Sequence, residues 1–114
     1  MNYFIVPGIN KQYRSKSMSE LNEIAEYCCE FFKISRETFM GKKRNRRITE
    51  ARFHFMHYAR LKEGYNLADI GRCLNKDHTT VMHGVTTMSN LMSVDESYRS
   101  QNKKFEMYLN IMMK

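Results

Sequence analysis

The sequence lacks the features that mark membrane, secreted and disulfide-rich proteins. No apolar run approaches the roughly 18 to 20 residues of a membrane span, and the run Tyr3 to Val6, which stops at Pro7, is too short for the core of a signal peptide. The three cysteines are an odd number, two of them adjacent, and form no disulfide framework. We therefore expect a cytoplasmic protein with buried thiols and no contact with a membrane.

The residue patterns of nucleotide hydrolysis and metal chemistry are also missing. The five glycines are scattered, and Gly41 lacks the earlier glycine that a Walker A loop requires. His54 and His57 have a spacing that could hold a metal, but no Cys or carboxylate pair completes the ligand set. No nucleophile and base, and no cluster of carboxylates, stands out. We therefore expect no enzymatic activity, no cofactor and no metal.

One segment of the chain carries the whole excess of positive charge. The 114 residues include 19 Lys and Arg against 12 Asp and Glu, a net charge of +7. Between Lys33 and Lys62 there are ten basic and two acidic residues, a net charge of +8 that leaves −1 for the remainder. A chain of this length with 42% apolar residues is expected to fold as one domain. Its basic segment indicates an anionic partner, nucleic acid first.

Apolar residues recur at spacings of three and four along most of the chain, which predicts an all-α fold. Residues 1–18 are interpreted as an N-terminal arm, 19–93 as the main domain, and 94–114 as a C-terminal helix that packs on the domain or on a partner. Helices are predicted at about 19–32, 36–40, 49–63, 67–74, 78–92 and 95–112. Four of them have a residue suited to an N-cap, a side chain that accepts a hydrogen bond from the first turn: Ser17 or Ser19 for the first helix, then Ser35, Asn66 and Asp77.

The fourth and fifth predicted helices are separated by a very short turn, Asn75-Lys76. The fifth helix has an apolar face that begins at Val81, whereas its outer N-terminal face carries the hydrogen-bonding side chains of residues 78–80 and 83. Gly71 permits a close crossing of the two helices. This arrangement is typical of a helix-turn-helix, whose second helix enters the major groove of DNA.

The basic segment contains a run, Lys42 to Arg47, of five cations in six residues with nothing apolar to bury. Such a run is either a loop or a frayed helix end, and taken alone it is often nonspecific or merely solvated. Arg52 and Arg60, eight residues apart on the third predicted helix, lie about 80° from each other around its axis. Both are expected to stay outside the buried stripe of that helix and to extend the basic surface.

Two runs give the sequence a family resemblance: residues 67–71, Leu-Ala-Asp-Ile-Gly, and residues 76–84, Lys-Asp-His-Thr-Thr-Val-Met-His-Gly. Together they resemble the duplex-DNA-binding domain of the bacterial chromosomal replication initiator DnaA. The resemblance extends over residues 19–93 and implies a compact multi-helix domain of the DnaA domain IV, Trp-repressor-like type. The turn before Asp77 is one residue shorter than the family's usual Gly-Gly-Arg, and Phe53 replaces a glutamine.

The resemblance also implies a role for each residue in binding double-stranded DNA. Base edges in the major groove would be approached by Lys76, Asp77, His78, Thr79 and Thr80. The minor groove would be entered by Arg44. Phosphates would be held by Lys42, Lys43, Arg46, Arg47, Arg52, Arg60 and His83.

Three functions are compatible with these observations. The first is sequence-specific binding at DnaA-box-like sites by a free-standing protein without an ATPase module, encoded by a phage or mobile element, that regulates replication initiation or transcription. The second is a protein-interaction module that binds an initiator or a second copy of itself through the arm or the last helix, where Tyr98, Phe105 and Met112 are spaced by seven. The third is a nonspecific nucleoid protein.

Overall fold

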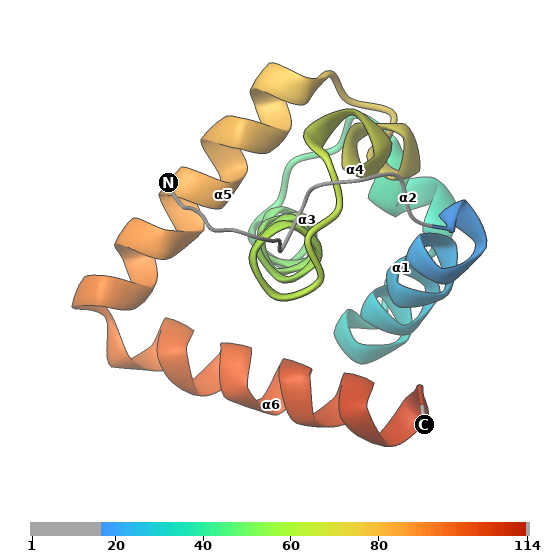
Figure 1. Ribbon diagram of the computed structural model, residues 1–114. Helices are drawn as coiled ribbons and strands as arrows, with labels where there is room; N and C mark the ends of the chain where they lie inside the picture. Colours follow the sequence, from blue (N-terminus) through green and yellow to red (C-terminus); the bar gives the residue numbers. More distant parts are fainter. Residues whose placement is uncertain (1–16, 114) are drawn as a thin grey trace, which may run out of the picture.

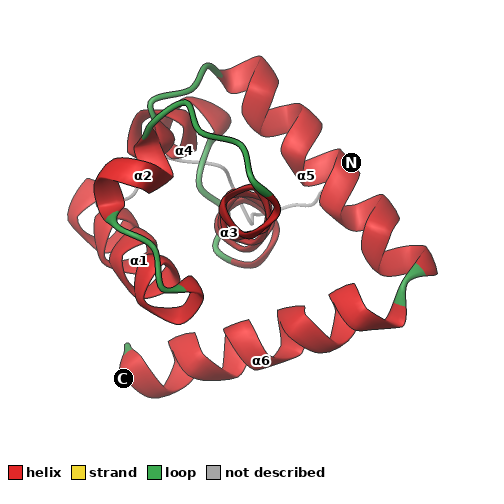
Figure 2. Ribbon diagram, turned by 180° about the vertical axis from the view of Figure 1, so that it is seen from behind, coloured by secondary structure: helices red, strands yellow, loops and turns green. Residues whose placement is uncertain are grey.

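The computed structural model describes residues 17–113, and within that range all regular secondary structure is helical, as predicted (Figures 1 and 2). The helices run in the order α1 (Met18–Phe32), α2 (Arg36–Met40), α3 (Arg46–His57), η1 (Tyr58–Lys62), α4 (Leu67–Leu74), α5 (His78–Val94) and α6 (Glu96–Met112). Of the predicted N-terminal arm, only Ser17 and Met18 belong to the described residues. No helix in this part of the chain is long and apolar enough to cross a membrane.

The helices begin where short side chains can accept hydrogen bonds from the first turn. Ser17 accepts from the backbone N–H of Glu20, and Ser35, Asn66 and Asp77 do the same for the residue three positions on. The caps predicted at Ser35, Asn66 and Asp77 are confirmed, and of the two candidates for α1 the structure selects Ser17 over Ser19.

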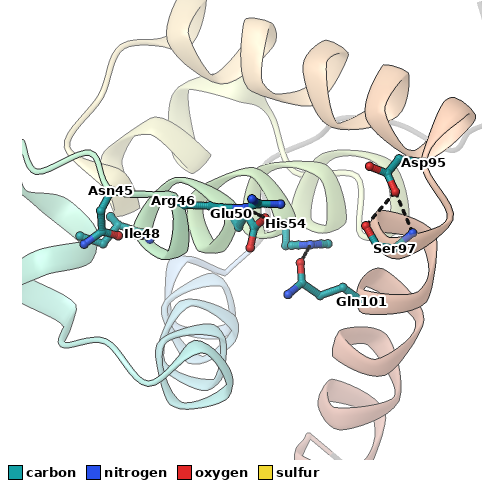
Figure 3. A network of polar contacts seen from close by, with 8 residues as sticks. All are labelled: Asn45, Arg46, Ile48, Glu50, His54, Asp95, Ser97 and Gln101. Atoms are coloured by element: carbon teal, nitrogen blue, oxygen red, sulfur yellow. Dashed lines mark hydrogen bonds and ion pairs between the residues drawn. The ribbon is translucent and has the colours of Figure 1, made fainter.

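The start of α3 differs from the prediction. The helix begins at Arg46 rather than at Thr49, because the Asn45 side chain accepts from the N–H of Ile48 at 3.0 Å and caps it (Figure 3). The cationic run is therefore divided between a loop, residues 42–44, and the first turn of a helix. At its other end α3 continues into the π-helical η1, and Gly64, with φ of 78°, follows as the expected left-handed residue.

Helix α3 lies in the middle of the domain, surrounded by α1, α4, α5 and α6 (Figure 1). Its central position explains why Ala51 and Phe55 are fully buried, as is Ala59 of η1, which continues the helix. Phe39 of α2 packs edge-on against Phe55, with ring centroids 5.4 Å apart. Tyr65, which the sequence did not single out, is fully buried in the loop before α4 and donates from its hydroxyl to Glu20 at 2.9 Å.

Helix α6 closes the core on one side. Phe105 is fully buried, and its ring lies within 6 Å, centroid to centroid, of four aromatic rings on α1, α3 and η1. Phe105 therefore cannot belong to an exposed seam with Tyr98 and Met112, and that part of the prediction was wrong. Residues 98, 105 and 112 therefore do not form one exposed face of α6 that a partner helix could contact.

His54 and His57 belong to the packing between α3 and α6. His54 Nε2 is 2.9 Å from the side-chain oxygen of Gln101 on α6 (Figure 3), and both histidines are buried. Burial lowers the pKa of each imidazole, because the charged form loses its hydration. Among the described residues, no group of three or more His, Cys, Asp or Glu side chains could hold a metal ion.

Candidate nucleic-acid interface

The turn between α4 and α5 is tight. Asn75 ends α4 in the left-handed conformation, with φ of 58°, and the N–H of Lys76 donates to the carbonyl of Gly71 at 2.9 Å. A side chain on Gly71 would bring its Cβ to 2.4 Å from the carbonyl oxygen of Lys76. Only glycine fits there, so the close crossing expected from the sequence is present.

The N-terminus of α5 is open to solvent and rich in hydrogen-bonding groups. His78, Thr79, Thr80 and His83 are all exposed. Asp77 accepts the N–H of Thr80 at 2.9 Å, and this bond lowers the pKa of its carboxyl group. The first turn of α5 thus combines a fixed cap with exposed imidazole and hydroxyl groups, next to the positive end of the helix dipole.

A groove of about 310 Å³ lies where this helix packs on α3. Arg44, from the loop before α3, lines the groove together with Thr80 and His83 of α5. The floor is more apolar and includes Phe53 and Met56. The structure therefore brings the arginine predicted for the minor groove close to the threonine predicted for the major groove.

A second, shallow depression lies at the start of α4. Arg60 faces it together with Leu67, Ala68, Arg72 and His78. The Arg60 guanidinium also donates to the carbonyl of Tyr65 at 3.2 Å, which holds it beside the helix terminus. Asp69 also lines this depression, but its carboxylate is paired with Arg72. An anion at this place would therefore meet Arg60 and the N-terminal end of a helix.

The other cations of the run face a third depression, beside α2. Lys43, Arg46 and Arg47 line it, together with Lys33. Arg46 is also 3.1 Å from the carboxylate of Glu50, one turn further along α3 (Figure 3). Consecutive cations in the sequence thus lie on different sides of the loop, whereas Lys42 is exposed at its tip.

The expected exposure of Arg52 was wrong. Only 6% of this residue is accessible, and its guanidinium donates to backbone carbonyls of α2 and of the loop after it. The inner stripe of α3 is wider than predicted because α2 and the loop cover that face of the helix. Most of the donors that a phosphate would use are therefore engaged within the protein.

The side chain of Lys76 also differs from the expectation. Its ammonium group donates to the carbonyl of Gly41 at 2.8 Å and to that of Leu74 at 3.3 Å. These bonds direct it toward the loop rather than past the N-terminus of α5. No signal in the sequence marks this contact, because the two residues are 35 positions apart.

A comparison with protein families matches residues 21–88 to the model described as the bacterial DnaA protein helix-turn-helix. The matched region begins in α1 and ends in α5, so it includes the turn and the groove.

Similar full-length proteins carry the name chromosomal replication initiator protein DnaA. That of Caldanaerobacter subterraneus is 37% identical over 78 residues, which cover 68% of this chain and 18% of the relative. That of Bacteroides thetaiotaomicron is 28% identical over 90 residues, or 78% and 19% of the two chains. For Aquifex aeolicus the identity is 30% over 81 residues, or 70% and 20%. The chain thus spans about a fifth of the length of these relatives.

Proposed function

Because this chain belongs to the bacterial DnaA helix-turn-helix family, we propose that it binds double-stranded DNA sequence-specifically, at sites similar to the DnaA box. One observation carries the proposal: Arg44 and the N-terminal turns of α5 border the same groove. Two reading elements placed side by side can enter adjacent grooves of one duplex. Occupation of such sites would regulate replication initiation or transcription.

The exposed side chains of α5 suit the major groove. Threonine hydroxyls and imidazoles donate to or accept from base edges, and the methyl group of threonine packs on that of thymine. His78, Thr79 and Thr80 are short or planar, so the helix can approach the bases closely. Asp77, fixed as the cap, accepts from the exocyclic amine of a cytosine if it reaches one.

Arg44 suits the minor groove. It is exposed on a loop beside α5, and no ion pair occupies its side chain among the described salt bridges. A narrow, A·T-rich minor groove has an enhanced negative potential that attracts an inserted arginine. Arg44 would therefore add recognition of DNA shape to the base contacts of α5.

Phosphates would be held around these two elements. The residues proposed for this role are Lys42, Lys43, Arg46, Arg47, Arg60 and His83. They are exposed or half-buried and line the groove or the neighbouring depressions, apart from Lys42 at the loop tip. Such contacts orient the protein on the duplex and contribute little sequence information.

A mobility-shift titration tests the proposal. Duplexes that contain a DnaA box should bind more tightly at physiological salt than scrambled duplexes of equal length and composition. Equal affinity for the two duplexes would contradict specific recognition and favour a nonspecific nucleoid protein.

The outer face of α6 favours self-association as a second candidate function. Met107 and Ile111, one helical turn apart, are 57% and 71% exposed, and Val94 at the preceding corner is 81% exposed. A second copy of the chain could cover these side chains. Light scattering at rising protein concentration would detect a dimer, and Ile111→Lys should abolish it; a monomer at every concentration would contradict this function.

A further inference from the structure

One backbone carbonyl joins the loop that carries Arg44 to the turn of the helix-turn-helix. The oxygen of Gly41 accepts from Arg52 Nη2 at 3.0 Å and from Lys76 Nζ at 2.8 Å. Arg52 comes from the buried face of α3, and Lys76 comes from the turn before α5. Three separate segments of the chain therefore meet at this atom.

Arg52 fixes more of the loop than this one residue. Its Nε donates to the carbonyl of Phe39 at 2.8 Å, Nη1 to that of Lys43 at 2.8 Å, and Nη2 also to that of Thr38 at 2.9 Å. An arginine has five N–H donors in a rigid fork, and four of them are used here. The carbonyls lie on both sides of Gly41, up to the residue before Arg44.

Lys76 holds the same loop from the other side. Burial, then the nearby charges of Arg52, Arg44 and Lys42, lowers the pKa of its amine. The charged ammonium group is disfavoured at this place, and it donates to two backbone carbonyls, those of Gly41 and Leu74. We therefore infer that Lys76 stabilises the fold. Its hydrogen bond to Gly41 joins the loop to the turn that precedes α5.

We propose that Arg52 and Lys76 are positioning residues that set the distance between Arg44 and α5, and thereby make simultaneous reading of both DNA grooves selective. This inference rests on the proposed function for its consequence in DNA binding. The loop has no apolar side chain between Lys42 and Arg47 to anchor it in the core. Hydrogen bonds from Arg52 and Lys76 therefore hold the loop in place of hydrophobic packing.

A digestion without DNA tests the clamp, by which we mean the hydrogen bonds from Arg52 and Lys76 to the carbonyls of the loop. Trypsin cleaves after Lys42, Lys43 and Arg44 only when the loop opens, so Lys76→Met should speed this cleavage relative to cleavage after the exposed Lys62 at the end of η1. Arg52→Lys, which keeps the charge but loses the fork, should have the same effect. Lys104→Met, at an exposed position on α6, is the matched control and should leave the ratio unchanged. Cleavage of the loop at the wild-type relative rate in Lys76→Met would overturn the proposal, even if Arg52→Lys does not fold.

Binding to box and scrambled duplexes then separates positioning from direct contact. Lys76→Met should reduce the preference for the box about fivefold or more, as the loss of one good base contact would, and leave the slope of log K against log salt unchanged. Lys42→Met should do the reverse, with a slope smaller by about one and the preference retained. Lys76→Arg, which can still donate to Gly41, should restore most of the preference.

A slope lowered by about one in Lys76→Met would mean that Lys76 contacts a phosphate, and it would overturn the positioning role. If wild-type protein itself fails to prefer the box, the proposed function fails instead, and the digestion still decides whether the clamp exists.

Discussion

Arg44 and Arg52 are eight residues apart in one basic segment, and their guanidinium groups have opposite surroundings. Arg44 is exposed at the edge of the groove, whereas Arg52 is buried and bonded to four carbonyls. Equal charge therefore does not mean equal function. One arginine is free to meet a ligand, and the other stabilises the fold.

Replacing Arg44 should affect binding and not folding. Arg44→Ala is expected to weaken binding to a box by about 1–3 kcal/mol, because a minor-groove contact is lost. The unfolding free energy should change by no more than about 0.5 kcal/mol, as for other exposed positions. Titration by fluorescence anisotropy and thermal unfolding would measure the two effects. A large fall in stability with unchanged affinity would contradict this assignment.

Replacing Arg52 should have its first effect on stability. Arg52→Ala leaves several carbonyls of α2 and the following loop without donors, at a cost of about 2–4 kcal/mol. Urea unfolding followed by circular dichroism measures this loss, and Arg47→Ala, which removes an exposed cation, is the control. A variant as stable as the wild type would show that water replaces the guanidinium without cost.

At the scale of the element, the helix-turn-helix depends on a backbone contact that leaves no space. The carbonyl of Lys76 lies where a Cβ of Gly71 would be, and the N–H of the same lysine donates to the carbonyl of Gly71. The angle between α4 and α5 is therefore fixed by main-chain atoms. This contact therefore also sets the direction in which the side chains of α5 point.

Gly71→Ala should accordingly disturb both stability and DNA binding. Overpacking costs about 1–3 kcal/mol, and the better helix propensity of alanine returns up to about 1 kcal/mol. We expect a net loss of about 1–2 kcal/mol and weaker binding to a box, measured by urea unfolding and mobility shift. Asn75→Gly, which keeps the left-handed residue of the same turn, should leave both quantities near their wild-type values. Equal behaviour of the two variants would contradict the role given to Gly71.

The packing of α6 on α3 should make stability depend on pH. The pKa values of His54 and His57 are lowered in the folded protein, mainly by burial. As the pH falls below about 6.5, the unfolded chain binds protons that the folded protein resists, so the unfolding free energy decreases until the folded-state pKa values are passed. Thermal unfolding at pH 7.5 and 5.5 tests this, and His54→Gln combined with His57→Gln should flatten the profile. A melting temperature that rises on acidification would contradict it.

At the scale of the whole molecule, the basic segment of residues 33–62 lies beside α5, whose first two turns are nearly neutral. Its cations line three separate depressions, but one of them, Arg52, is bonded to carbonyls within the protein. Lys76, which lies outside the segment, is bonded in the same way to Gly41. The surface available to phosphates is therefore smaller than the net charge of +8 in residues 33–62 suggests.

The salt dependence of binding should reflect this smaller set. With about five neutralised phosphates, log K is expected to fall with log salt at a slope of roughly −4 to −5. Mobility shifts between about 50 and 200 mM salt would measure it, and a scrambled duplex should give a similar slope, since phosphate contacts are indifferent to sequence. A slope near −1 would contradict the proposed interface.

The sequence by itself determined the local features of this protein. The caps at Ser17, Ser35, Asn66 and Asp77 were predictable because each is a bond between a side chain and an N–H three residues away. The helical class and the tight turn follow from periodicity and from residues that tolerate special backbone conformations. The start of α3 was predicted three residues too late, because Asn45, its cap, lies within a run of cations that has no apolar periodicity.

Only the tertiary structure decided which cations are free. Arg52 and Lys76 bond to carbonyls 9 to 14 and 35 residues away, and Phe105 is buried by rings from three other helices. Charge and spacing in the sequence describe a side chain and its local neighbours, but not the distant residues that contact it in the folded protein. Whether it then meets a backbone carbonyl or solvent depends on how distant helices pack, because burial and hydrogen bonding are settled by contacts between segments far apart in the chain.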